Sequence, residues 1–305
     1  MCKFIVRCVL VFLLLPQGFN VAVLAQNESD GRIARLPVQY EQLTAPQFVD
    51  AVAASGGVCM IPLGILEKHG PHLPLGTDLI NCRETALRAA QSEYCVVFPE
   101  YYVGQIFEAR HQPGTVAYSN NLMWMMLQET CDELARNGFK KIVLVNGHGG
   151  NNNFLMYFCQ SQLATSRDYV VALFSPETDT SVERRARQLR KTTTGGHADE
   201  VESSMLFAHR PELVHLEKAA TESGADQHRL AGLPYLFTGI WWYARYPNHY
   251  AGDGSNGNRE LGELYLASES RQLAAMIKVL KSDRSIQDLQ DRFQQQARSP
   301  VPDRR

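Results

Sequence analysis

The sequence predicts an α/β fold in which a mainly parallel β-sheet lies between layers of helices. Short apolar strands alternate with helical segments along the chain, which is typical of βαβ units with right-handed crossovers. The strand expected at 140–145 is apolar without alternation, as required when helices cover both faces of a sheet. The 305 residues are 45% hydrophobic and 20% charged, which fits one globular domain with a substantial core.

The N-terminus has a different character from the rest of the chain. A basic start, an apolar run over 8–15 and small residues ending at Ala25 predict a signal peptide over 1–25. Cleavage near Ala25 would make the protein periplasmic or secreted. An uncleaved membrane anchor is the alternative, although the apolar run is short for a membrane span. A polar linker is expected over 26–39.

The domain is expected to begin with two helices and two short strands in alternation. A helix over 44–52 is expected to start at a Thr44 cap, with a proline in its first turn. Residues 58–61 form a short apolar run and predict a buried strand. Apolar residues recur with helical spacing over 79–94, and a second strand at 95–99 stops at a proline.

The alternation continues through the middle of the chain. A helix over 122–137 is expected to end at Gly138, because glycine adopts the left-handed conformation that closes many helices. The apolar strand at 140–145 follows, then a helix over 152–166 and a strand at 169–174. Polar loops thus follow several strands at one edge of the predicted sheet.

The last part of the chain is predominantly helical. A basic run over 183–191 predicts a solvated helix rather than a binding patch, and a helix is expected over 260–281. From residue 282 onward the sequence predicts a mobile polar tail. No repeat or second domain is evident, so one domain is expected over 40–281. The formal net charge of -2 provides no basic surface for nucleic acid.

The segment after the first strand combines carboxylates with imidazoles. Glu67 and His69 are two residues apart, so an extended backbone would direct both side chains to one face. Asp78 can return to the same place after a turn rich in glycine and proline. Ligands bind at the carboxyl ends of strands in open α/β sheets, and this residue mixture suits Zn²⁺, Mn²⁺ or Fe²⁺. The alternative is a solvated glutamate and an incidental loop histidine.

Two further segments add residues of the same type. His148 lies in a glycine-flanked turn directly after the strand at 140–145. The two alternatives for this residue are a metal ligand and an incidental turn residue. His197 follows a pair of glycines, and Glu202 would lie in the first turn of the next helix. Acidic residues there can simply complement the helix dipole. The two can serve one site only if His197 lies in the turn before the helix.

Together these motifs resemble the creatininase (creatinine amidohydrolase) family over roughly residues 40–280. The matching segments are Glu67-Lys68-His69-Gly70-Pro71-His72 with Thr77-Asp78, His111-Gln112-Pro113-Gly114-Thr115, Asn146-Gly147-His148-Gly149-Gly150-Asn151, and His197-Ala198-Asp199-Glu200-Val201-Glu202-Ser203-Ser204. The resemblance implies a three-layer α/β/α sandwich with a mainly parallel sheet and two divalent metal ions per chain, either Zn, Mn or Fe. It also implies a homo-oligomer, because family members often form hexamers.

The resemblance also implies roles for individual residues. Glu67 and His148 would hold one metal ion, and His69 and Glu202 would hold the other. Asp78 would bridge the two ions. His197 would be the catalytic acid/base. The residues that could line the pocket are His72, His111, Gly149, Gly150 and Asn151.

The implied activity is hydrolysis of a C–N bond in a small linear or cyclic amide through a metal-bridged hydroxide. Creatinine itself is a poor candidate, because creatininase proper has Tyr and a catalytic Glu where this chain has Gly149 and Gly150. Thr193 and Thr194 also replace a Trp-Asp pair. The alternatives are a lactone or ester hydrolase with the same centre, or a non-catalytic metal-binding scaffold. The expected partner is a small-molecule amide, with no nucleic acid and no membrane after signal cleavage.

The cysteines do not indicate a nucleophile. Five follow the signal region without any CxxC pair: Cys59, Cys82, Cys95, Cys131 and Cys159. They are expected to be mainly small buried apolar residues. The alternative is one disulfide among them in an exported protein, for which their spacing specifies no pairing.

Overall fold

A four-stranded parallel sheet organises the structure, a computed structural model that describes residues 36–301. The strand order is β2-β1-β3-β4, which confirms the predicted α/β class. The strands are β1 (Val58–Leu63), β2 (Val96–Val97), β3 (Lys141–Asn146) and β4 (Val170–Leu173). Every residue of β1 is buried, as expected for a central strand covered on both faces.

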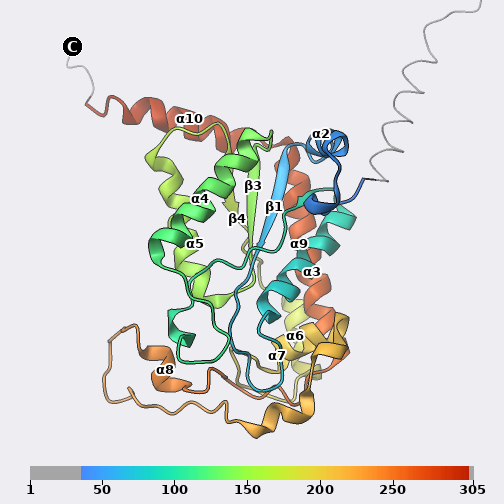
Figure 1. The fold of residues 1–305 in the computed structure, drawn as a ribbon, viewed down its shortest axis with the longest axis vertical. Coiled ribbons are helices and arrows are strands. Elements are labelled where there is room, and N and C mark those ends of the chain that lie inside the picture. Colours follow the sequence, from blue (N-terminus) through green and yellow to red (C-terminus); the bar gives the residue numbers. More distant parts are fainter. Residues whose placement is uncertain (1–35, 302–305) are drawn as a thin grey trace, which may run out of the picture. The chain divides into compact units, whose positions relative to one another are not determined.

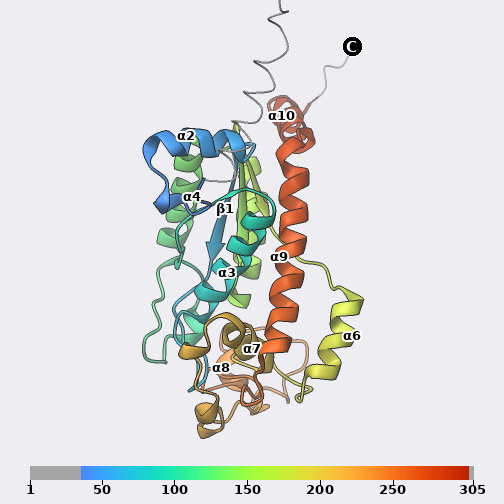
Figure 2. The same cartoon turned by 90° about the vertical axis from the view of Figure 1, so that its right-hand side faces the viewer.

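Helices cover both faces of the sheet (Figures 1 and 2). Helices α3 (Thr77–Ser92) and α9 (Arg259–Ser282) pack on one face, and α4 (Asn120–Arg136) and α5 (Asn152–Ser161) lie over the other. Alternate residues of β1 and β3 form the main core with α3 and α9, because successive side chains of a strand point to opposite faces. This core includes Val58, Met60, Val143, Val145, Ala86, Ala89, Leu273 and Ile277.

The remaining elements flank this sandwich. They are η1 (Tyr40–Gln42), α2 (Ala45–Ala54), η2 (Phe107–Ala109), η3 (Gly149–Asn151), η4 (Gln162–Ala164), α6 (Thr180–Leu189), α7 (Glu200–His209), η5 (Pro211–Leu213), η6 (Leu216–Thr221), α8 (Trp241–Arg245) and α10 (Ser285–Ala297). Thr44 caps α2 as predicted and forms a capping box with Gln47. Helices α7 and α8 lie near the lower edge of the view in Figure 1, beyond the carboxyl ends of the strands.

Two differences from the sequence-based expectation concern the start of α3 and the C-terminal tail. Helix α3 begins at Thr77, so Asp78 lies in its first turn rather than in the preceding loop. Residues 285–297, expected to belong to a mobile polar tail, instead form α10. Ile286 packs against the core, and Gln294 donates a hydrogen bond to the Leu163 carbonyl at 2.8 Å. One apolar contact and hydrogen bonds from glutamine side chains to distant carbonyls therefore hold this largely polar helix against the domain.

Several predictions concern the N-terminus and the cysteines. The predicted signal peptide and most of the linker lie outside the described residues. Within residues 36–301, no helix has the length and apolar character needed to cross a membrane. The five cysteines of the domain are free; four are buried and Cys159 is partly buried. This agrees with their expected role as small apolar residues.

Candidate metal centre

The turns after β1 and β3 receive the start of α3 between them. The register pairs the last residues of the two strands, so both end at the same level. A Cβ at Gly64 would lie 2.4 Å from the Leu79 backbone nitrogen, and one at Gly147 would lie 2.7 Å from the Asp78 carbonyl oxygen. Only glycine permits such close packing of backbone. The first turn of α3 therefore lies against both strand ends, which brings Asp78 next to their loops.

Glu67, Asp78 and His148 form one compact group of buried side chains. His148 Nδ1 lies 2.8 Å from Glu67 Oε1 and 3.0 Å from Asp78 Oδ2. The other ring nitrogen, Nε2, donates to the Gln105 carbonyl at 3.0 Å, so Nδ1 carries the lone pair when the ring is neutral. Neither carboxylate oxygen receives a hydrogen bond. With His148 neutral, three lone-pair atoms converge at this buried position, as the ligands of a cation do. Without a cation, burial opposes protonation, but Glu67 and Asp78 outweigh it and raise the pKa of His148 well above its usual range, so Nδ1 is protonated.

His69 lies on the other side of Asp78. Its Nδ1 donates to the Glu67 backbone carbonyl at 3.2 Å, while its Nε2 lies 2.8 Å from Asp78 Oδ1. Glu202 Oε2 lies 3.9 Å from the same Nε2 and accepts the Ala198 N–H at 2.5 Å. Asp78 therefore directs one carboxylate oxygen toward His69 and the other toward His148.

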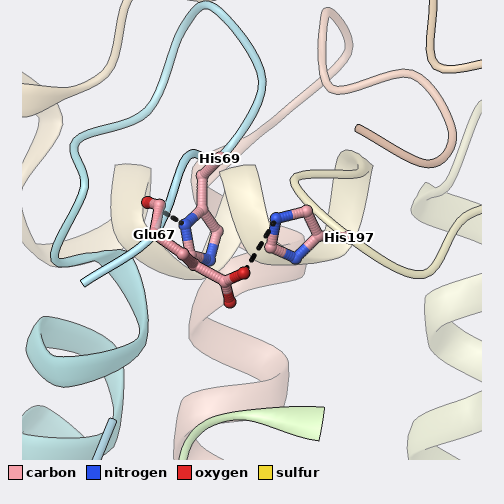
Figure 3. A group of neighbouring side chains, drawn as sticks. All are labelled: Glu67, His69 and His197. Carbon is pink, nitrogen blue, oxygen red and sulfur yellow. Dashed lines mark hydrogen bonds and ion pairs between the residues drawn. The ribbon is translucent and has the colours of Figure 1, made fainter. Parts of the chain in front are cut away.

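His197 stands in the turn before α7, close to the same cluster. Figure 3 shows the His197 ring beside the Glu67 carboxylate and the His69 ring, and the centroids of the two imidazole rings are 4.3 Å apart. His197 Nε2 donates to the Lys68 carbonyl at 2.8 Å. Its Nδ1 lies 3.9 Å from Glu202 Oε2. The free nitrogen of the neutral His197 ring is therefore Nδ1.

The charges in this cluster separate the histidines into two kinds. Burial opposes protonation of His69, but the facing Asp78 outweighs it and raises the pKa to about 10. Burial lowers the pKa of His197 to about 3, despite the attraction of Glu67. Burial also raises the pKa of Glu202 to about 8, against the effect of the nearby His69. The part of the cluster around Asp78 and His69 therefore attracts positive charge, whereas the His197 ring remains neutral.

His249 joins the cluster although the sequence analysis did not single it out. It is 2% exposed, and its Nε2 contacts Glu67 Oε2. Its Nδ1 accepts the indole N–H of Trp242 at 2.9 Å. Its backbone adopts the left-handed conformation, with φ of 52°. An isolated histidine in an irregular aromatic segment carries no spacing signal, so only the three-dimensional contacts identify it.

The two histidines expected to line the pocket make other contacts. His72 is 1% exposed, and its Nε2 lies 2.8 Å from Ser203 Oγ. His111 is exposed and donates to the Pro247 carbonyl at 2.8 Å. Their described contacts are with segments beside the cluster rather than with the candidate metal ligands.

The two glycines after His148 have different surroundings. Gly149 is exposed, and nothing lies within 4 Å of the Cβ position that a larger residue would have. A Cβ at Gly150 would lie 2.3 Å from His148 Nε2 and 3.0 Å from Glu108 Oε1. A larger residue at 150 would therefore displace the ring of His148. The carboxylate of Glu108 occupies neighbouring space.

Asn151 supports His148 through an intermediate residue. It is fully buried, and its Oδ1 accepts the Gln105 backbone N–H at 2.8 Å. The carbonyl of Gln105 in turn accepts the His148 Nε2–H. Asn151 thus fixes the ring orientation of a candidate ligand.

Buried carboxylates and imidazoles beyond the carboxyl ends of a parallel sheet define an α/β protein with a candidate metal centre. The sequence profile of the creatininase family, described as creatinine amidohydrolase, matches residues 41–277. Creatinine amidohydrolase from Pseudomonas putida is 27% identical over 191 residues, which cover 58% of this chain and 74% of that protein. The chain belongs to the creatininase family and is a hydrolase of that family.

Other relatives extend this comparison. A mycofactocin precursor peptide peptidase from Mycolicibacterium smegmatis is 36% identical over 98 residues, which cover 30% of this chain and 39% of that protein. A solved creatinine amidohydrolase structure has the same fold, with a TM-score of 0.69 and 24% identity over 81% of this chain and 99% of the other. Solved creatininases include a manganese form and a zinc–zinc form.

Proposed function

We propose that the protein is a two-metal amidohydrolase that cleaves a C–N bond of a small linear or cyclic amide other than creatinine. The observation that carries this proposal is the orientation of Asp78, whose two oxygens face one histidine each. A carboxylate in this arrangement can bridge two ions. The nitrogen and oxygen donors suit Zn²⁺, Mn²⁺ or Fe²⁺.

The residues divide into two ligand sets that share Asp78. Glu67 Oε1, Asp78 Oδ2 and His148 Nδ1 would hold the first ion, because these atoms converge and the two oxygens receive no hydrogen bond. His69 Nε2, Asp78 Oδ1 and Glu202 Oε2 would hold the second. Two divalent ions, when bound, supply the Lewis acidity that activates water and polarises an amide carbonyl.

His197 would move the proton that hydrolysis requires. The Lys68 carbonyl holds Nε2–H, which leaves Nδ1 as the accepting atom. The pKa of about 3 leaves this nitrogen unprotonated before reaction but also makes it a weaker base than an exposed imidazole, so proton uptake depends on the attraction of Glu67 for the charged ring. His197 Nδ1 can take a proton from the attacking water and pass it to the departing nitrogen.

The test measures metal content and turnover separately. We expect elemental analysis to find about two divalent transition-metal ions per chain, as a two-metal mechanism requires. Activity is screened on a panel of linear amides, lactams and lactones. The variant His197→Gln should keep its metal content while losing about 10²- to 10⁴-fold in turnover. His228→Gln serves as the control, because that ring is 75% exposed.

Other outcomes favour the alternatives. Turnover of lactones alone would indicate an ester-type hydrolase. Stoichiometric metal without turnover on any substrate would favour a metal-binding scaffold. Absence of metal after loading with zinc, manganese and iron would refute the two-metal proposal.

We further propose that the protein is exported and forms a homo-oligomer. The basic and apolar N-terminal sequence supports export. The resemblance to the creatininase family supports the assembly. Cell fractionation and N-terminal sequencing test the first proposal, and light scattering of the purified protein tests the second.

A further inference from the structure

We propose that His249 is a positioning residue for Glu67, and that Trp242 holds His249 in place. This inference rests on the proposed metal-binding function. It assigns the irregular segment around α8 a part in building the centre. The segment supplies no metal ligand of its own in this arrangement; it orients one supplied by the loop after β1.

The contacts form a chain from Trp242 to the candidate ligand. The Trp242 indole can only donate, so its 2.9 Å hydrogen bond makes His249 Nδ1 an acceptor. The proton of the neutral His249 ring then lies on Nε2, which contacts Glu67 Oε2. The tautomer and the orientation of His249 are therefore set by its two neighbours.

Burial and backbone conformation indicate that this contact is specific. Glu67 is fully buried, and His249 is 2% exposed. His249 has a φ of 52°, a conformation that is unfavourable for a residue with a Cβ. The surrounding contacts must hold the residue there.

The contact assigns different tasks to the two oxygens of Glu67. Oε2 receives the His249 N–H, whereas Oε1 receives no hydrogen bond and lies 2.8 Å from His148 Nδ1. Oε1 is therefore the oxygen available to an ion held with Asp78 and His148. Glu67 is expected to bind that ion through one oxygen.

The same assignment argues against an alternative grouping of side chains. Glu67, His69 and His197 also lie close enough to hold an ion (Figure 3). In that group, however, Glu67 Oε2 already accepts from His249, and His197 Nε2 already donates to the Lys68 carbonyl. An ion bound through Glu67 Oε2 and His197 Nε2 would break both of these hydrogen bonds.

The first experiment compares metal affinity in matched variants. His249→Asn removes the imidazole but keeps a residue that tolerates positive φ. Zinc binding to the purified, metal-stripped protein is measured by calorimetry. We expect one of the two binding steps to weaken by about 10- to 100-fold, the usual effect of losing a hydrogen-bond partner of a metal ligand. Trp242→Phe, which retains an aromatic ring but lacks the N–H, should weaken the same step by less.

His228→Asn is the control for the backbone conformation. His228 has a φ of 51°, but its side chain is 75% exposed. Both zinc-binding steps should be unchanged in this variant. Unchanged affinity in His249→Asn would overturn the proposal. If His249→Asn does not fold, as judged by circular dichroism, Trp242→Phe decides, and unchanged affinity there overturns it.

A second measurement does not depend on metal binding. Nitrogen-15 NMR of histidine-labelled, metal-free protein should show the His249 Nε2–H proton at low field, because it donates to a buried carboxylate. Its loss in His249→Asn distinguishes it from the His69 Nε2–H proton, which faces Asp78. The His249 resonance should move upfield in Glu67→Gln, since an amide oxygen is a weaker acceptor than a carboxylate. It should stay unchanged in His228→Asn. Absence of the resonance overturns the positioning role, whereas failure of the wild type to bind zinc counts against the proposed function.

Discussion

The strand-end loops and the segment over 214–250 lie beside the same cluster but are built differently. The loops after β1 and β3 pack against α3, and Glu67, His69 and His148 there are all at least nine-tenths buried. The segment over 214–250 contains only short helices and exposes several large apolar side chains. These include Leu233, Tyr235, Leu236, Phe237 and Ile240.

This difference separates two tasks in the candidate centre. The candidate ligands come from loops anchored on the sheet and from the starts of α3 and α7, where the backbone is held on several sides. The irregular segment contributes the Trp242–His249 contact, which orients a ligand. Metal geometry needs rigid support, whereas a hydrogen-bonding residue can be delivered by a less regular segment.

The largest expected effect comes from Asp78, which faces both histidines of the strand-end loops. In Asp78→Asn the charge that both ions would share is lost. We expect affinity for both ions to fall by more than about 100-fold, beyond the usual effect of changing a residue that only supports a ligand. Elemental analysis after dialysis measures this loss. Asp168→Asn is the control, because that side chain is 78% exposed, and equal metal content in both variants would contradict the bridging role.

A second comparison concerns stability in the two regions. Leu144 is fully buried in β3, so Leu144→Ala should lower the free energy of unfolding by about 2–5 kcal/mol. Leu236 is 60% exposed, and Leu236→Ala should change it by no more than about 0.5 kcal/mol. Urea denaturation of the metal-free protein measures both. Similar losses would show that the irregular segment is packed as firmly as the sheet.

The third prediction uses the opposite pKa shifts of the two kinds of histidine. The His69 pKa is raised to about 10, so the folded metal-free protein keeps that ring protonated at neutral pH. A bound ion must displace this proton, and affinity should rise by about tenfold per pH unit for each proton released between pH 7 and 9. His197, with a pKa of about 3, should release none. Calorimetry in buffers of different ionisation enthalpy counts the protons, and pH-independent affinity would contradict the prediction.

The fold was predictable because its signals are local. The apolar strand at 141–146 and the helical spacing of α9 appear directly in the sequence. The proximity of Glu67, His69, Asp78 and His148 also followed, because parallel strands end at one edge of a sheet. The association of His197 with Glu202 needed only a turn before a helix.

The missed features depend on contacts between distant segments. His249 meets Glu67 across 182 positions, and nothing in its local sequence specifies this contact. Asn151 reaches His148 through the backbone of Gln105, which sequence patterns cannot reveal. The docking of α10 also depends on carbonyl groups that lie more than a hundred positions away.

The spread of the candidate ligands along the chain has a consequence for folding. Asp78 stands between His69, from the loop after β1, and His148, from the turn after β3, while Glu202 comes from α7. Bound ions would tie these three distant segments together, so the loaded site cannot form before the sheet and α7 have assembled. Ions would then slow unfolding more than they speed folding. At a free ion concentration 1,000 times the dissociation constant, one bound ion adds about 4 kcal/mol to the free energy of unfolding.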